Sequence, residues 1–95
     1  MFYSVSSELY REVARRLSEA IGCRSYFSGT LAFAWGEAEC RLTASVIVCR
    51  RRVSAPDGQA DVISRLVPVW WEFHTLLDGV ERLNDFSFGE LGAWI

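Results

Sequence analysis

Hydrophobic and polar side chains alternate along Val67–Thr75, which reads VPVWWEFHT and holds the only histidine of the chain. A period of two is typical of a strand with one face on a hydrophobic core. The positions expected on the core side are Val67, Val69, Trp71 and Phe73. The positions expected on the opposite side are Pro68, Trp70, Glu72 and His74. We expect the rest of the chain to be organised around this strand, with its second face available for chemistry or binding.

Residues 6–21 have the pattern of an amphipathic helix. Apolar side chains recur there at three- and four-residue spacing, at Leu9, Val13, Leu17, Ala20 and Ile21. Ser6 is a suitable N-cap, and Gly22 is well placed to end the helix. Arginine and glutamate are interleaved on the remaining positions, which favours a solvated helix face over a nucleic-acid-binding surface.

The next segment predicts a two-stranded hairpin. Gly36-Glu37 suits a two-residue type II′ turn, so Trp35 is expected opposite Ala38. Counting back from that pair gives an apolar face with the pairs Phe33–Cys40, Leu31–Leu42, Gly29–Ala44 and Phe27–Val46. The reverse face carries mostly small side chains, in the pairs Ala34–Glu39, Ala32–Arg41, Thr30–Thr43 and Ser28–Ser45.

Pro56-Asp57-Gly58 predicts a second tight turn, with Ala55 opposite Gly58. This register continues the core side through the pairs Val46–Val67, Ala44–Val69, Leu42–Trp71 and Cys40–Phe73. On the other face it gives the pairs Arg41–Glu72, Glu39–His74 and Thr43–Trp70. Pro68 has no N–H to donate, so it predicts a bend or a bulge in the third strand.

Asp78-Gly79 predicts a third turn, type I′ by preference, and a fourth strand over about Val80–Asp85. A two-residue loop would direct Arg82 and Asn84 towards the core, whereas a three-residue loop would direct Leu83 and Asp85 there. The register of this strand therefore stays open.

A short C-terminal helix is expected after the fourth strand. Ser87 and Glu90 have the spacing of a capping box, and Phe86 with Leu91 fits the hydrophobic staple that often accompanies one. Trp94 and Ile95 are expected to anchor this helix.

These elements predict an α+β fold in a single domain of residues 1–95. An N-terminal helix packs on a four-stranded antiparallel meander sheet, and a short C-terminal helix follows. The order of elements resembles the cystatin-type arrangement, but the Gln-x-Val-x-Gly loop of those inhibitors is absent, so protease inhibition is not implied. The run VPVWWEFHT followed by LNDFSFGEL, about the last third of the chain, resembles a group of small bacterial α+β proteins with no known activity.

Composition narrows the functional classes further. The formal net charge is −2, which gives no attraction to nucleic acid or acidic membranes. No apolar run approaches the ~20 residues that cross a bilayer, and no signal sequence is evident, so we expect a cytoplasmic bacterial protein. The cysteines Cys23, Cys40 and Cys49 form no CxxC pair, and with one histidine we expect neither a metal site nor a cofactor.

The residues best suited to chemistry are Glu72, His74, Asp85, Glu39 and Arg41. Glu72 and His74 share a strand face, and a two-residue loop would place Asp85 opposite Glu72. Two close carboxylates raise one pKa, and an imidazole beside them could move a proton. The alternative is a charged ladder on a solvated sheet, with no catalytic role. Because no nucleophile, second metal-binding imidazole or pocket accompanies the set, we favour this charged ladder, and a small-ligand-binding or enzymatic site around Glu72 and His74 is the runner-up.

Trp70 is the leading candidate for a binding surface. It falls on the polar face beside small side chains, so the predicted interface is Trp70, Thr43, Ser45, Thr30 and Ala32. Exposed aromatic residues dominate many protein interfaces, which favours a homodimer or another protein partner. The alternative is that a loop, Trp94 or the N-terminal residues Met1-Phe2-Tyr3 cover Trp70.

Arg50, Arg51 and Arg52, with Arg65 across the hairpin, form the one basic cluster in the sequence. They could hold phosphate, but no glycine-rich phosphate loop or pair of stacking aromatics accompanies them. We expect a solvated strand end and no nucleic-acid partner.

Overall fold

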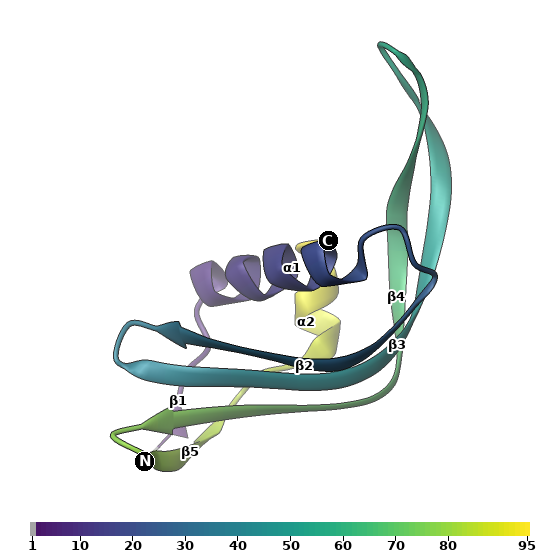
Figure 1. The fold of residues 1–95 in the computed structure, drawn as a ribbon. Coiled ribbons are helices and arrows are strands. Elements are labelled where there is room, and N and C mark those ends of the chain that lie inside the picture. Colours follow the sequence, from purple (N-terminus) through teal and green to yellow (C-terminus); the bar gives the residue numbers. More distant parts are fainter. Residues whose placement is uncertain (1) are drawn as a thin grey trace.

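The sheet runs along one side of the molecule and bends sharply around the long helix (Figure 1). The computed structural model describes residues 2–95. The elements in chain order are β1 (Phe2–Tyr3), α1 (Ser7–Ile21), β2 (Tyr26–Trp35), β3 (Ala38–Ala55), β4 (Gly58–Leu77), β5 (Val80–Asn84) and α2 (Phe88–Gly92). Over these residues the strands form one five-stranded sheet in the order β1-β5-β4-β3-β2.

The α+β class is therefore confirmed, and the four-stranded antiparallel sheet is wrong in detail. Phe2 and Tyr3 add a fifth strand, which pairs in parallel with Leu83 and Asn84 of β5. Two residues are too few for a period of two to be visible, so sequence patterning gave no signal for this strand.

Helix α1 begins and ends where the capping residues predict. The Ser6 hydroxyl accepts a hydrogen bond from the Leu9 N–H at 3.2 Å. At the other end Gly22 adopts a φ of 57°, and its N–H bonds to the Ser18 carbonyl. The solvated side of the helix carries an ion-pair network in which Glu12 contacts both Arg15 and Arg16. These hydrogen bonds hold the pKa of Glu12 well below its usual range, at about 2.

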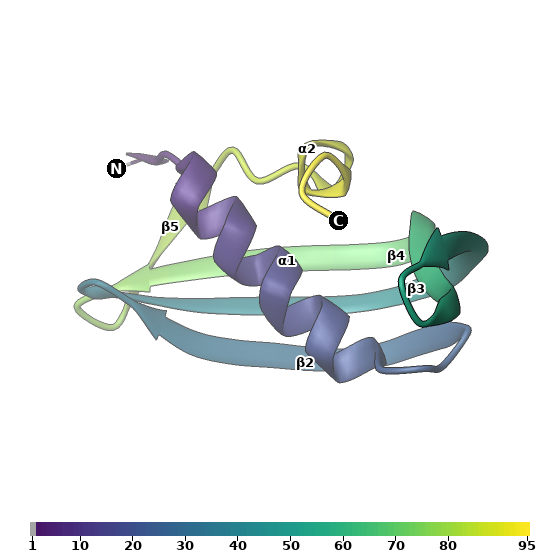
Figure 2. The ribbon, with the colours of Figure 1, turned by 90° about the horizontal axis from the view of Figure 1, so that it is seen from above.

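The β2–β3 hairpin has the predicted register at every counted pair, from Trp35–Ala38 to Phe27–Val46. One face of this hairpin packs against α1, and we call it the inner face. The opposite face of the sheet, which carries residues such as Thr30, Thr43 and Trp70, is called the outer face. Both helices lie on the inner side (Figures 1 and 2).

The predicted register between β3 and β4 is wrong by two residues in the body of the sheet. Ala55 does pair with Gly58, but the register shifts between Cys49 and Arg50 and again between Ser45 and Val46. Each bulge adds one residue to β4, so Leu42 lies opposite Phe73 instead of Trp71. The second shift lies beside Pro68, which confirms the irregularity expected there.

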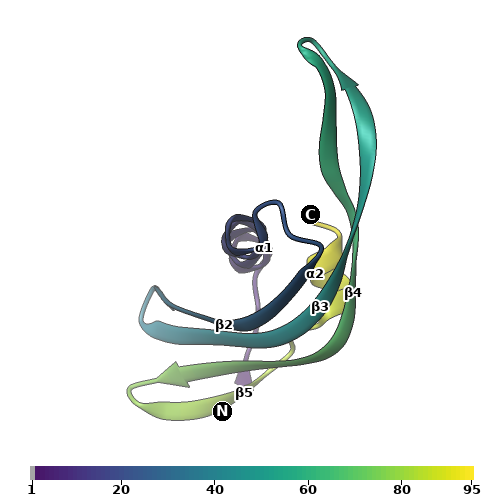
Figure 3. The same cartoon turned by 45° about the vertical axis from the view of Figure 1, so that its right-hand side comes forward.

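Beyond the end of β2, strands β3 and β4 continue alone as a two-stranded ribbon. We call residues 49–66 the arm; it projects from the sheet past the helices (Figures 1 and 3). The sheet bends where the arm leaves the body (Figure 3), and the β3–β4 pair that bends carries the bulge next to Pro68. The molecule is consequently elongated, at 49 × 25 × 18 Å.

The turn before β5 is the two-residue type, with positive φ at both Asp78 and Gly79, which fits type I′. Arg82 and Asn84 therefore face inward. The Asn84 side chain donates to the Phe73 carbonyl and the Thr75 hydroxyl and accepts from the Phe86 N–H. Fully buried Thr75 in turn donates to the Arg82 carbonyl, so most polar groups at this sheet edge find partners.

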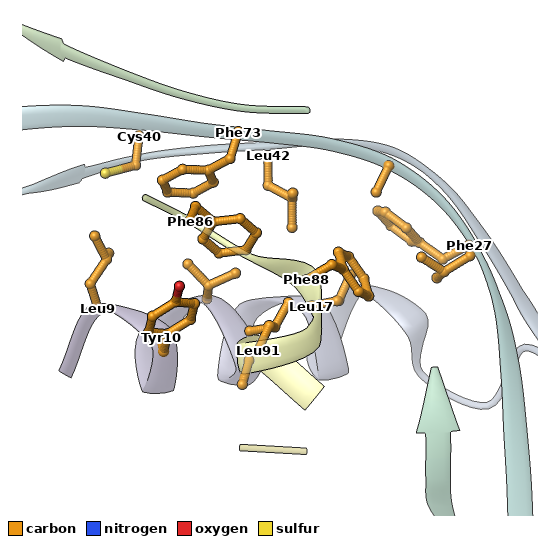
Figure 4. Close-up of a cluster of buried hydrophobic side chains, with 14 of the residues drawn as sticks. Leu9, Tyr10, Leu17, Phe27, Cys40, Leu42, Phe73, Phe86, Phe88 and Leu91 are labelled. Atoms are coloured by element: carbon orange, nitrogen blue, oxygen red, sulfur yellow. The ribbon is translucent and has the colours of Figure 1, made fainter. Parts of the chain in front are cut away.

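The core is formed by α1, the inner face and the C-terminal segment (Figure 4). Phe86 stacks on Phe73 and on Tyr10, with ring centroids 4.1 and 5.3 Å away. Trp71 was predicted in the core but is 36% exposed and only borders this cluster, edge-on to Phe86. The Tyr10 hydroxyl accepts a bond from the Ser87 N–H, and this bond ties the start of α2 to α1.

Helix α2 starts after Ser87, as predicted, but the capping box is wrong. The Ser87 side chain makes no capping hydrogen bond. Phe86 and Leu91 are both buried, in agreement with a hydrophobic staple. Packing of apolar side chains therefore positions this short helix.

Candidate functional site

The predicted polar site is rearranged by the shifted register. His74 lies opposite Arg41, and Glu72 lies opposite Thr43, so the predicted pairs Arg41–Glu72 and Glu39–His74 are wrong. Glu39 lies opposite Leu76. The bulges changed the partners but kept Glu72 and His74 on the outer face, because two shifts of one residue add up to an even number.

Asp85 does not face Glu72. Strand β5 ends at Asn84, and the Asp85 carboxylate accepts a 2.7 Å hydrogen bond from the Val5 N–H. Asp85 thereby fixes the segment between β1 and α1, on the side of the sheet edge away from the predicted site. Its role here is structural.

The carboxylate that does join His74 is Glu81. The imidazole Nδ1 lies 3.0 Å from Glu81 Oε1, and Nε2 lies 3.0 Å from Glu72 Oε2. The hydrogen bond to Glu72, followed by that to Glu81, raises the pKa of His74. With both ring nitrogens facing carboxylates, the cationic imidazolium is the form that satisfies all three groups.

Sequence reasoning missed Glu81 because the register of the fourth strand was open. The two-residue turn pairs Glu81 with Leu76, which places Glu81 diagonally next to His74 on the outer face. The preference of Asp78-Gly79 for a two-residue type I′ turn was the signal that would have given this register and placed Glu81 beside His74.

This Glu72–His74–Glu81 triad has limited chemical capacity. All three side chains are at least one-third exposed, and an imidazolium held by two carboxylates is a poor proton acceptor. No group of three metal-ligating side chains with suitable geometry occurs within residues 2–95. A hollow of about 310 Å³ adjoins the triad, where His74 and Glu81 meet Trp71, Arg82 and Leu83.

A second hollow, of about 260 Å³, lies over the β2–β3 end of the sheet. Its outer-face lining includes Ala32, Ala34, Glu39, Arg41 and Leu76. Small alanine side chains next to longer charged ones leave this space. Arg41 and Glu39 thus line a hollow separate from the triad.

The outer face near Trp70 combines small polar side chains with exposed apolar ones. Trp70 lies opposite Ser45 instead of Thr43, again because of the two bulges. Ser28 and Ser45 share a hydrogen bond of 3.0 Å, and Thr30 and Thr43 share another. Trp70 is 49% exposed, and its exposed apolar neighbours on this part of the sheet are Tyr26, Ile47 and Val69.

The residues considered as cover for Trp70 lie elsewhere. Trp94 follows α2 on the inner side, where Arg11 of α1 stacks 5.1 Å from its ring. Phe2 and Tyr3 pair with β5 at the opposite edge of the sheet from β2. Met1 lies outside the described residues. Within residues 2–95, therefore, these candidates leave the outer face around Trp70 open.

The arginine cluster is divided between the two faces of the arm. Arg50 turns inward and donates to the carbonyls of Gly22 and Arg24 at 2.6 and 2.8 Å. Arg52 lies 3.4 Å from Asp61. Arg51 alternates to the outer face, as does Arg65 opposite Cys49. This arrangement does not form the single basic surface that nucleic-acid binding requires.

Comparison of the chain with models of protein families, with curated proteins and with solved structures finds no match. Across residues 2–95, neither helix has the length and apolar character to span a bilayer.

Proposed function

We propose that this protein is a non-catalytic association domain that binds a second copy of itself through the outer face around Trp70. The observation that carries the proposal is the exposed apolar group of Trp70, Tyr26, Ile47 and Val69, with Val69 64% exposed. Contiguous apolar groups on a sheet surface mark interaction sites, and tryptophan and tyrosine contribute most to binding energy.

The polar residues beside this group support the same role. The hydroxyls of Ser28 and Ser45 satisfy each other, as do those of Thr30 and Thr43. A partner can remove water from these pairs without leaving a buried donor or acceptor unpaired. Their small size also allows a second sheet to approach to the ~10 Å spacing of packed sheets.

Charge around the apolar group favours a second copy as the partner. Arg65 lies on the outer face on the arm side of Trp70, and Glu72 lies on the body side. A two-fold axis near Trp70 brings Arg65 of one copy towards Glu72 of the other. The contact is then self-complementary, with charged residues at its rim.

The test is the oligomeric state of Trp70→Arg by light scattering after size exclusion. Trp70 is half exposed, so the substitution should leave the fold intact by circular dichroism while removing the contact. Val80→Arg, at a similarly exposed residue on the β4–β5 turn, is the matched control and should associate like wild type. A wild-type protein that stays monomeric at high concentration contradicts the proposal.

A second candidate function is binding of a small ligand at the Glu72–His74–Glu81 triad. The hollow beside the triad, with Trp71 in its lining, favours this alternative. A thermal-shift screen with metabolites and metal ions tests it. Stabilisation by a compound should disappear in both Glu72→Ala and His74→Ala; if no compound stabilises wild type, the alternative fails.

A further inference from the structure

We propose that the free edge of β2 pairs with β2 of a second copy, antiparallel, about a two-fold axis at Thr30. This contact uses the backbone at the edge of the sheet and is distinct from the outer face around Trp70. It therefore goes beyond the proposed function and does not depend on it.

Strand β2 is the one long edge within residues 2–95 that carries no protection against pairing. Natural sheets guard their edges with charges, prolines, bulges or very short strands. Strand β1 is two residues long, and the exposed edge of β4 carries Pro68, Arg65 and two bulges. The β3 side of the arm carries Arg50–Arg52. In contrast, the ten residues of β2, YFSGTLAFAW, contain no charge and no proline, and their register is unbroken.

The hydrogen-bonding pattern between β2 and β3 determines which residues of β2 direct their backbone N–H and C=O groups to the free edge. Val48 lies opposite Ser25 in the β2–β3 register, and the Val48 N–H donates to the Ser25 carbonyl at 2.8 Å. This is the geometry of a hydrogen-bonded antiparallel pair, and such pairs alternate along a ladder. Odd-numbered residues of β2 therefore bond to β3. The N–H and C=O groups directed to the free edge belong to Tyr26, Ser28, Thr30, Ala32 and Ala34.

The number of backbone groups that can be satisfied at these five residues favours one register for pairing with a second β2 strand. With the axis at Thr30, the pairs are Thr30 with Thr30, Ser28 with Ala32, and Tyr26 with Ala34. All five N–H and all five C=O groups of each copy are then satisfied, which makes ten hydrogen bonds across the contact. A shift of two residues in either direction leaves one of the five without a strand partner. The register centred on Thr30 is thus the most complete.

The side chains on both faces suit this pairing. On the outer face, Ser28, Thr30 and Ala32 are small and uncharged. On the inner face, Gly29 of one copy lies opposite Leu31 of the other, and the Phe27 ring lies over Gly29, 3.4 Å from where a Cβ would be. Next to the axis a small side chain therefore faces a larger one on the inner face, and further out Phe27 of one copy faces Phe33 of the other, an aromatic cross-strand pair.

Helix α1 leaves room for the added strand. A groove of about 450 Å³ runs between α1 and the edge, lined by Arg16, Glu19 and Ala20 of the helix and by residues 30–32 of β2. Figure 2 shows β2 as the last strand of the sheet on this side, with the C-terminal half of α1 above it. Its lining includes Thr30, the residue at which the two-fold axis is placed.

If both contacts form, edge pairing joins the sheets of two copies into one continuous sheet. The outer faces of two such dimers then pack together, which gives a tetramer. Trp70→Arg then leaves an edge-paired dimer, and an edge variant leaves a face-packed dimer. The two contacts can therefore be tested separately on one protein.

The first experiment compares Ala32→Pro with Ala32→Val. Proline removes an N–H that faces the free edge and bonds to nothing in β3, so an edge strand tolerates it. By symmetry two hydrogen bonds of the contact are lost, and we expect association to weaken about 30-fold. Ala32→Val keeps the N–H and should associate like wild type. Both variants are made in the Trp70→Arg background, and equal association of the two overturns the proposal.

The second experiment does not depend on how well proline is tolerated. Thr30→Cys and Ala34→Cys are each made in a Cys23→Ser, Cys49→Ser, Trp70→Arg background, which removes the outer-face contact, and treated with a short bis-maleimide crosslinker. Position 30 meets itself at the axis, whereas the two copies of position 34 lie roughly 27 Å apart, at ~3.4 Å per residue. Crosslinked dimer at position 30 alone supports the proposal. Equal crosslinking at both positions, or none at position 30, overturns it.

Discussion

Replacing Phe86 tests whether the C-terminal segment belongs to the main core. Its side chain is 6% exposed and stacks on both Phe73 and Tyr10, with Trp71 at its edge. Truncation of a buried phenylalanine to alanine costs ~3–5 kcal/mol. For a domain of this size that lowers the melting temperature by at least ~12 °C, at roughly 4 °C or more for each kcal/mol. Much of a typical stability of ~5–15 kcal/mol is lost.

Two further variants separate burial from stacking. Phe86→Leu keeps most of the apolar volume but loses the aromatic contacts, so it should cost ~1–2 kcal/mol. Leu83→Ala removes an exposed side chain and should stay within ~0.5 kcal/mol of wild type. Urea unfolding followed by circular dichroism measures all three. A cost below ~1 kcal/mol for Phe86→Ala would show that the segment is not part of the core, and this reasoning would be refuted.

The remaining predictions concern titratable groups. The pKa of folded His74 is raised above the ordinary value of 6.5, so its ion pairs stabilise the fold fully below pH 6.5, and this stabilisation is lost as the pH rises through the raised pKa. His74→Gln should therefore cost under ~1 kcal/mol at about pH 6 and nothing near pH 9, by urea unfolding; an equal cost at both values contradicts this. Burial raises the pKa of the Cys40 thiol to about 11. A thiol reagent should label exposed Cys23 in the native protein and Cys40 only after unfolding, and fast native labelling of Cys40 would contradict its burial.

The sequence was most informative where a turn fixes the register directly. Gly36 and Gly58 both mark the turns they predict, and the β2–β3 register holds over its whole length because that hairpin has no bulge. The β3–β4 register failed because its two bulges add residues that no turn residue signals. Pro68 indicated one of them, but a proline does not say how many residues are inserted.

The candidate site was predictable to the level of sheet faces but not of partners. Alternation placed Trp70, Glu72 and His74 on the outer face. This assignment is correct because the two one-residue register shifts together preserve the face of each side chain. Which carboxylate meets His74 depended on the β4–β5 register, where inward-facing Arg82 and Asn84 obscured the pattern. The Asn84 side chain is compensated by hydrogen bonds to the Phe73 carbonyl and the Thr75 hydroxyl, which hydrophobic periodicity cannot show. The buried Nε of Arg82 has no hydrogen-bond partner among residues 2–95.

The β3–β4 hairpin has two regions of different local stability, the part within the body of the sheet and the arm. In the body, residues such as Leu42 and Val46 have a strand on each side and α1 across the inner face. Along the arm each strand has a single neighbour, and an isolated two-stranded ribbon is only marginally stable in water. The free energy of opening therefore rises from near zero at the Pro56 turn to the global value in the body. The hairpin can fray and re-form at its tip while the sheet below it stays intact.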